Sequence, residues 1–216
     1  LVLGRISVGD RIPAQLVKST ERPTTAALLI HPEGSSAALG SVNSPSSLAR
    51  ELSRRGYLVL SIDTFQTGEA RESSRQMQGN FFPAYNRTDD MQRVQDILTA
   101  VTYLEAVSHA PRLVIAGHGR AGLWCLLARP FLATPCPIAA DIARFESGND
   151  EVYLKQLHIP LLRRAGDFQT AALLGSGSPL LLHNCGEHFA TESYRRAFSV
   201  QGASGRLRIS AAELPV

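Results

Sequence analysis

Short runs of consecutive apolar residues recur along the chain and alternate with segments of helical periodicity. Continuously apolar runs of this length are typical of strands that are covered on both faces of a sheet. The pattern predicts strands at residues 26–30, 57–62, 113–116, 138–142, 159–162, 180–182 and 206–209. Because helical segments connect successive strands, most strands should lie parallel in one sheet.

The clearest helical pattern spans residues 88–107. Its apolar residues fall largely on one side, and Asp89 and Asp90 occupy the first turn, where the helix dipole favours negative charge. Shorter helices are expected at 123–130, at 191–202, and after Ser44, which would act as the cap with Pro45 in the first turn and Gly56 beyond the end. The expected fold is therefore α/β: a three-layer α/β/α sandwich around a mostly parallel sheet.

Two polar segments interrupt this alternation, at residues 71–86 and 144–157. The first becomes aromatic at Phe81 and Phe82. Ligands of open parallel sheets bind beyond the carboxyl ends of the strands, so both segments could roof a pocket there. The alternative is that they only cover the edge of the sheet.

Length and composition fit one soluble globular domain over residues 1–216. The chain is 44% hydrophobic and 19% charged, and its apolar runs are far shorter than the roughly 20 residues of a membrane-spanning helix. It begins at Leu1, without a recognisable targeting peptide, so we interpret it as a processed or excised piece of a longer protein. No membrane association is expected.

Charge and cysteine content exclude several partners. The formal net charge is +3, but the arginine pairs lie far apart in the sequence, which disfavours a nucleic-acid partner. The three cysteines have no regular spacing, and neither a disulfide framework nor a zinc cluster is expected. We predict no cofactor and no metal.

One segment has the pattern of a catalytic motif. It is LVIAGHGRAGLW, from Leu113 to Trp124, and it predicts a buried strand, a turn of small residues and the start of a helix. A nucleophile elbow has this layout, with small residues around one exposed central side chain. Gly119 occupies the central position. Glycine tolerates the strained backbone but offers no hydroxyl or thiol.

The same glycines also match the spacing GxGxxG of a phosphate-binding turn at a helix N-terminus. Asp141 lies near the offset at which a dinucleotide-binding unit has its acidic residue. That fingerprint usually follows the first strand of its unit, however, and the proline-rich stretch after residue 129 does not fit the expected crossover. The elbow is the favoured interpretation.

Three further motifs accompany the elbow segment AGHGRAGLW at 116–124. They are HPEG at 31–34, GYLVLSIDTFQTGEAR at 56–71 and YNRTDDMQRVQDILTAVTYL at 85–104. Together they resemble the α/β-hydrolase superfamily, in particular its acetylxylan esterase and dienelactone hydrolase branches. The resemblance covers roughly residues 20–130 and implies a reduced α/β-hydrolase-like fold.

The resemblance also implies roles for single residues. Glu33 or Gly34 would supply one backbone N–H of an oxyanion hole, and Arg120 the other. Asp167, after the predicted strand at 159–162, matches the acid of a catalytic triad, and His188 matches the histidine. Only the nucleophile would then be missing.

Other polar residues are expected at the same edge of the sheet. His31, Asp63, His118, His183 and Glu187 follow predicted strands or come shortly afterwards, and they could form an unusual acid/base pair or simply tie loops together. No HxH or HxxxH spacing supports a metal site among them.

Three accounts of the function remain open at this point. The first is an acetylxylan esterase-like domain that has lost its nucleophile and serves as a non-catalytic binding or accessory module beside a companion catalytic domain. The second is a carboxylic-ester hydrolase in which His188, oriented by Asp167, activates a water. The third is an esterase whose nucleophile was replaced artificially by Gly119. The ligand expected in each case is a small ester or carbohydrate, and the resemblance favours a secreted or periplasmic location.

Overall fold

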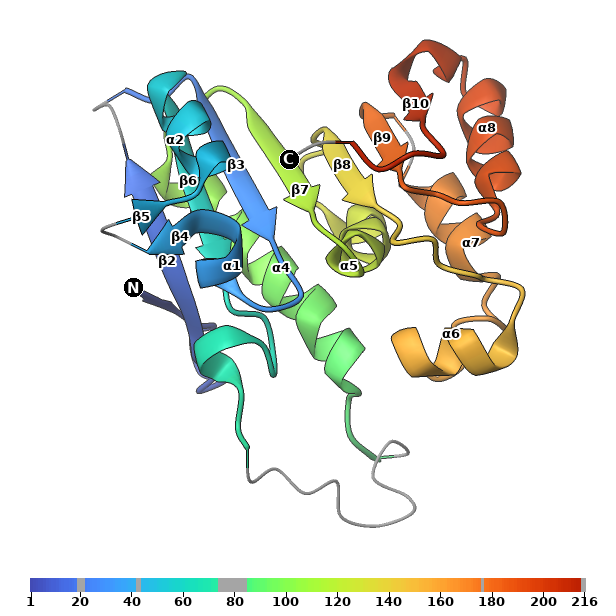
Figure 1. Ribbon diagram of the computed structural model, residues 1–216, viewed down its shortest axis with the longest axis horizontal. Helices are drawn as coiled ribbons and strands as arrows, with labels where there is room; N and C mark the ends of the chain where they lie inside the picture. The colour runs from blue at the N-terminus through green and yellow to red at the C-terminus, as the bar shows by residue number, and fades with distance from the viewer. Residues whose placement is uncertain (19–21, 42–43, 74–84, 176, 215–216) are drawn as a thin grey trace.

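A computed structural model describes the chain except for residues 19–21, 42–43, 74–84, 176 and 215–216. Its centre is a sheet of eight strands in the order β1-β2-β6-β3-β7-β8-β9-β10 (Figure 1). The strands from β6 to β10 in this order run parallel, whereas β1 and β2 at one edge are antiparallel. The predicted mostly parallel sheet is therefore confirmed.

The strands are short, as the apolar runs predict. Their bounds are β1 Val2–Leu3, β2 Ile12–Lys18, β3 Thr25–Ile30, β6 Tyr57–Ile62, β7 Leu113–Gly117, β8 Ile138–Asp141, β9 Leu180–His183 and β10 Leu207–Ile209. A separate two-stranded ribbon is formed by β4 Gly40–Ser41 and β5 Ser44–Pro45.

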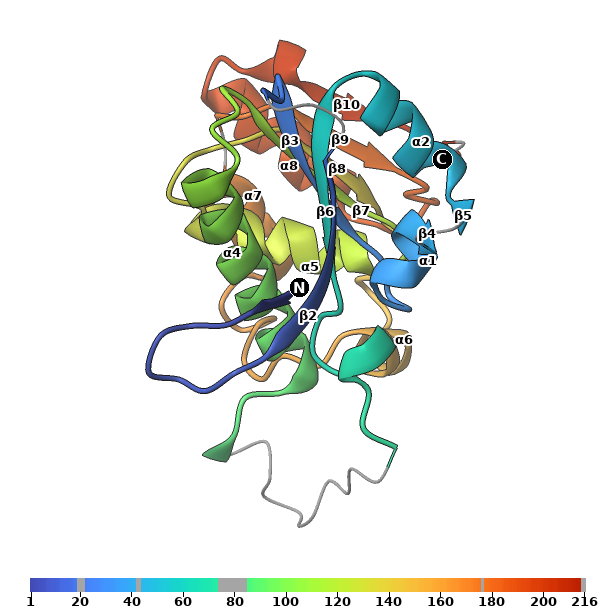
Figure 2. The same ribbon diagram turned by 90° about the vertical axis from the view of Figure 1, so that its left-hand side faces the viewer.

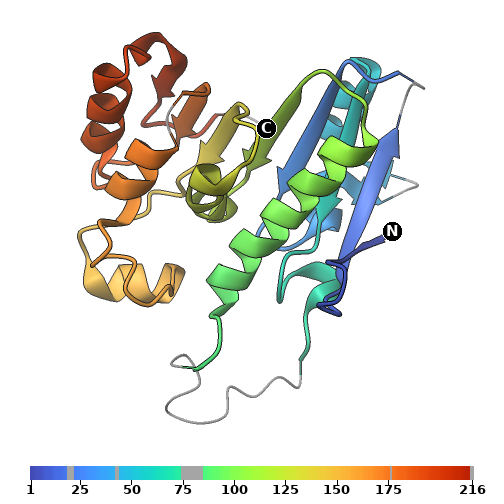
Figure 3. The same cartoon turned by 180° about the vertical axis from the view of Figure 1, so that it is seen from behind.

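Helices cover both faces of the sheet. They are α1 Ser35–Leu39, α2 Ser47–Arg54, α4 Asp89–Val107, α5 Ala121–Ala128, α6 Asp150–Gln156, α7 Asp167–Leu174 and α8 Thr191–Val200, with 3-10 turns at η1 Gly68–Ala70, η2 Arg129–Phe131 and η3 Ser204–Arg206. Seen from the side, the sheet lies between α4 and α7 on one face and α1 and α2 on the other (Figure 2). From behind, α4 crosses the sheet (Figure 3). These are the three expected layers.

Successive side chains along a strand point to opposite faces of the sheet and pack into two separate hydrophobic cores. In β3, Leu28 and Ile30 pack with α4 and α5, whereas Ala27 and Leu29 pack with α1 and α2. Because both sets are apolar, the strand is buried throughout, as its sequence predicts. Trp124 on α5 is fully buried in the larger core.

The helix predicted at 88–107 is confirmed as α4. Thr88 caps it by accepting a hydrogen bond from the Met91 amide, and Asp89 and Asp90 lie in the first turn. Among the described residues, no helix is both long and apolar enough to cross a bilayer.

Two expectations are wrong. Residues 160–166 form successive turns instead of a strand, because Pro160 cannot donate to a ladder and Leu161 adopts a left-handed backbone with φ 64°. The cap of α2 is Ser46, whose hydroxyl accepts from the Ala49 amide at 3.1 Å, whereas Ser44 pairs in β5.

The carboxyl ends of the parallel strands meet at one edge, with α6 beyond them (Figure 1). The loops that leave β3, β6, β7, β8 and β9 all start there. In open parallel sheets this edge is where ligands bind, so the candidate site is sought there.

Candidate functional site

The turn between β7 and α5 has Gly119 at its tip. Its φ is 53°, in the left-handed region that favours glycine. A Cβ built on Gly119 would meet only ring carbons of Pro32, at 3.5 and 3.9 Å, among the described residues beyond its chain neighbours. The tip therefore has room for a side chain, and no imidazole or carboxylate of another described segment lies within 4 Å of that point.

The flanking glycines allow β7, α5 and β8 to approach closely. A Cβ on Gly117 would lie 2.7 Å from the Gly122 Cα, and a Cβ on Gly122 would lie 2.0 Å from the Asp141 carbonyl oxygen. No larger residue fits at Gly122 without movement of the backbone. The small residues of this turn thus have a packing role that is independent of any reaction.

Asp141, the last residue of β8, fixes the tip of the turn. Its Oδ2 accepts a hydrogen bond from the Gly119 amide at 2.9 Å, and its Oδ1 accepts from the Ala143 amide at 2.7 Å and from Asn184 Nδ2 at 2.9 Å. The side chain is buried, and three donors from this chain occupy its carboxylate. It therefore serves as an anchor rather than as the ribose-binding acid of a dinucleotide site.

Two histidines stack beside this anchor. The rings of His31, after β3, and His118, after β7, lie 4.8 Å apart and nearly parallel. Partial burial lowers the pKa of His31, and the charge of His118 lowers it further. His118 Nδ1 lies 4.0 Å from Asp141 Oδ2, which is longer than a hydrogen bond.

A pocket of about 160 Å³ opens beside these rings, on the face covered by α1 and α2. His183 also lines it, and its Nδ1 accepts a hydrogen bond from the Leu214 amide at 3.4 Å. The structure thus brings His31, His118 and His183 to one pocket. Among the described residues, no three His, Cys, Asp or Glu side chains form a group that could hold a metal ion.

The predicted oxyanion donors differ in their availability. The Glu33 amide donates to His31 Nδ1 at 3.1 Å, and the Gly34 amide donates to the His31 carbonyl oxygen at 3.1 Å. The Arg120 amide has no hydrogen-bond partner among the described residues. Only one of the two expected sides of the oxyanion hole therefore presents a free N–H.

Asp63 holds two loops together at the same edge. Its Oδ1 accepts from the Ser35 amide at 2.5 Å, at the start of α1, and its Oδ2 accepts from the Glu69 amide at 3.0 Å, within η1. The carboxylate is buried against the backbone of Gly34 and Gly68. Its contacts are those of an anchor for the loops after β3 and β6.

The predicted acid and histidine are not joined by a hydrogen bond among the described residues. Asp167 is the first residue of α7, and its Oδ1 accepts a hydrogen bond from the Tyr153 hydroxyl of α6 at 2.8 Å. His188 and its neighbour Glu187 are exposed in the loop between β9 and α8. Because residues 160–166 are turns, Asp167 does not follow a strand.

The remaining candidates add no nucleophile. Cys125 is fully buried on α5, and burial raises the pKa of its thiol strongly. Phe81 and Phe82 lie outside the described residues.

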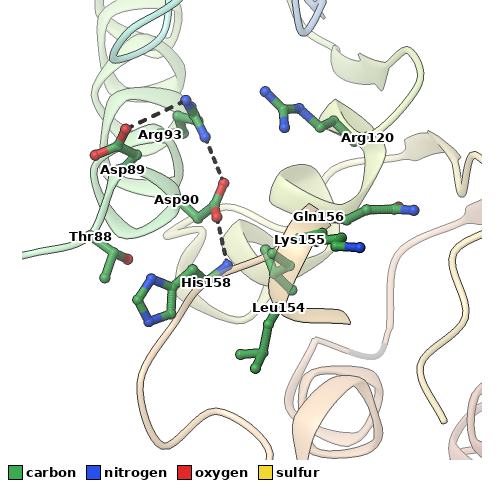
Figure 4. Close-up of a pocket in the computed structure, with 10 residues that line it drawn as sticks. Thr88, Asp89, Asp90, Arg93, Arg120, Leu154, Lys155, Gln156 and His158 are labelled. Carbon is green, nitrogen blue, oxygen red and sulfur yellow. Dashed lines mark hydrogen bonds and ion pairs between the residues drawn. The ribbon is translucent and has the colours of Figure 1, made fainter. Parts of the chain in front are cut away.

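A second pocket, of about 240 Å³, lies at the same edge between the starts of α4 and α5 and the end of α6 (Figure 4). Asp90 organises its wall: Oδ1 accepts from Arg93 Nη1 at 2.8 Å and from Trp124 Nε1 at 2.9 Å, and Oδ2 accepts from the His158 amide at 2.7 Å. Sequence analysis missed this cluster, although the spacing of Asp90 and Arg93 is that of a helical ion pair.

The fold is that of known hydrolases, although no family model and no curated protein matches the chain. The TT1662 protein of Thermus thermophilus superposes with a TM-score of 0.63 at 18% identity, over 98% of this chain and 90% of that one. The esterase Est1E of Butyrivibrio proteoclasticus, solved with ferulic acid, gives 0.58 at 13% identity, over 97% and 88%. A Klebsiella pneumoniae protein with a provisional dienelactone hydrolase assignment gives 0.58 at 16% identity, over 96% and 82%.

This chain has the α/β-hydrolase fold. In α/β-hydrolases the nucleophile stands on the sharp turn between a central strand and the following helix, and the next backbone N–H serves the oxyanion hole. The turn between β7 and α5 has the same strand–turn–helix layout, with Gly119 at its tip and Arg120 directly after it. The residue at this tip is a glycine, which has no side chain.

Proposed function

We propose that this chain is a non-hydrolytic α/β-hydrolase-fold module that binds a small ligand at the carboxyl edge of its sheet. The observation that carries the proposal is Gly119 at the tip of the elbow. Covalent ester hydrolysis by this fold needs a hydroxyl or thiol at that point. Glycine offers neither, and the one cysteine of the following helix is fully buried.

The surroundings of the tip support the same reading. A nucleophile is activated by a base within hydrogen-bond reach, which a third group orients. Asp141 is the carboxylate that contacts the tip, but it accepts from the Gly119 backbone. Asp167 is bonded to Tyr153 on α6, and His188 is exposed. These contacts favour binding over acid/base chemistry.

Ester turnover by purified protein tests the proposal. We expect no saturable hydrolysis of p-nitrophenyl acetate by the wild-type chain or by Gly119→Ser, because no imidazole or carboxylate of another described segment lies within 4 Å of the position of the new Cβ. The backbone at Gly119 costs a serine about 1–2 kcal/mol, so the variant should still fold. Circular dichroism and the melting temperature provide the folding control.

Two outcomes would overturn the proposal. Saturable turnover by the wild-type chain that disappears in His188→Ala would support a hydrolase that activates water. Turnover gained by Gly119→Ser would show that a complete base and acid surround the tip. Oxyanion stabilisation and binding alone can accelerate hydrolysis by about 10³ to 10⁴ over water, so the decisive quantity is the difference between variants.

A further inference from the structure

The pocket of Figure 4 is separate from the histidine pocket and begins one residue after the elbow tip. Its wall combines residues from three segments that are distant in the sequence: Asp90 and Arg93 from α4, Arg120 before α5, and Lys155 and His158 at the end of α6. Its volume of about 240 Å³ corresponds to about eight water molecules at roughly 30 Å³ each. A small organic molecule fits this space.

Most charges in the wall are already matched. Arg93 donates to Asp90 at 2.8 Å, lies 3.9 Å from Asp89, and donates through Nε to the Phe65 carbonyl oxygen at 2.9 Å. Lys155 lies at the rim and pairs with Glu151 at 2.6 Å. The guanidinium of Arg93 and the ammonium of Lys155 therefore each have an anionic partner.

Arg120 is the exception. Its guanidinium has no hydrogen bond or ion pair among the described residues, and lies over the face of Trp124 with Cζ 5.5 Å from the ring centroid. Burial lowers the pKa of Arg120 and the charge of Arg93 lowers it further, whereas the charge of Asp90 raises it. A half-buried guanidinium without a direct hydrogen bond or ion pair binds an anion favourably, because the anion replaces the water that burial has removed.

We propose that this pocket binds the carboxylate of a small organic acid, with Arg120 as its cationic contact. The inference rests on the proposed function and deepens it, because it gives the binding module a ligand class. Arg120 presents the planar fork of donors that pairs with a carboxylate in two parallel hydrogen bonds. Leu154 at the rim offers an apolar surface for the body of the acid.

The two acidic residues of the wall favour a monoanion over a dianion. Arg120 is the cation of the wall without an ion pair among the described residues, and Asp89 and Asp90 line the same pocket. A phosphate dianion would bring a second negative charge close to these carboxylates, whereas a carboxylate would match the single free guanidinium. The pocket should therefore discriminate between the two anions.

Trp124 is the only tryptophan of the chain and reports directly on this site. We would titrate the purified wild-type chain with cyclohexanecarboxylate and follow the fluorescence of Trp124. Cyclohexanecarboxamide, a neutral molecule of the same shape, and inorganic phosphate serve as the comparison ligands. We expect saturable binding of the carboxylate and at least tenfold weaker binding of the other two.

Two variants separate a specific site from general attraction to a basic surface. Arg120→Met keeps much of the apolar stem and removes the charge, and it should weaken cyclohexanecarboxylate binding about ten- to hundredfold, as expected for a lost charged hydrogen bond. Arg54→Met removes an exposed, already paired charge on α2, outside the lining of this pocket, and should change the affinity less than twofold. Calorimetry of both variants excludes a change that affects only the fluorescence.

The inference is overturned if the carboxylate does not bind, if the amide or phosphate binds equally well, or if Arg120→Met binds like the wild-type chain. Each of these results can occur with or without ester turnover. Failure of the ligand assignment is therefore distinguishable from failure of the non-hydrolytic function.

Discussion

Replacement of Asp141 by alanine should destabilise the protein strongly. The change removes a buried carboxylate that accepts from the Gly119 amide, the Ala143 amide and Asn184 Nδ2. Hydrogen bonds to charged groups contribute about 1.5–3 kcal/mol each, and bonds that share one acceptor group do not add fully. We expect the free energy of unfolding to fall by about 3–5 kcal/mol.

Urea denaturation followed by circular dichroism measures this loss. The free energy of unfolding of Asp141→Asn should lie between those of Asp141→Ala and the wild-type chain. The asparagine amide oxygen can still accept a hydrogen bond, whereas its NH₂ group would face a donor. The matched control is Asp150→Ala, which removes an exposed carboxylate paired with Arg163 and should leave the urea midpoint nearly unchanged. A loss below about 1 kcal/mol for Asp141→Ala would refute the role of Asp141 as an anchor.

Two further predictions concern the buried carboxyl of Asp96 on α4 and the glycines of the elbow. Burial raises the pKa of Asp96 to about 7 in the folded protein, whereas the unfolded carboxyl titrates near 3.9. Between these pH values the unfolded state therefore binds fewer protons than the folded state. The free energy of unfolding should fall as the pH rises from about 4 to 7, by up to about 1.4 kcal/mol per pH unit. Asp96→Asn should lose this dependence, and urea midpoints across that range test it. Gly122→Ala would place a Cβ 2.0 Å from the Asp141 carbonyl oxygen and should lower the free energy of unfolding by about 3 kcal/mol. Gly119→Ala has its nearest contact at 3.5 Å and should lower it by only about 1–2 kcal/mol. Equal melting temperatures for the two alanine variants would contradict this packing account.

Much of the fold could be predicted from local patterns. The apolar runs at 26–30 and 57–62 correspond to β3 and β6, which are covered on both faces. The helical pattern at 88–107 corresponds to α4, which begins after a capping threonine and has two acidic residues in its first turn. The run at 159–162 is also mostly apolar, but it contains Pro160 and forms turns instead of pairing in the sheet. The antiparallel β2 was missed because its pattern is less regular and one face is half-exposed.

The site was harder to predict because its key contacts join distant residues. Asp141 and Gly119 are 22 positions apart, and Asp90 and Trp124 are 34 apart. Sequence analysis identified the turn and several residues at the carboxyl ends of strands, including His31, whose position follows from where β3 ends. Pairings of side chains across strands and helices depend on tertiary packing, which no local pattern encodes.

The elbow tip carries no nucleophile, and no imidazole or carboxylate of another described segment lies within 4 Å of the point where a Cβ would stand. Exposure of the wild-type chain and Gly119→Ser to a fluorophosphonate, followed by intact-protein mass spectrometry, tests this most directly. We expect unmodified masses for both. A stoichiometric adduct on the wild-type chain would reveal another activated hydroxyl, and an adduct on Ser at position 119 alone would show that a working base stands beside the tip.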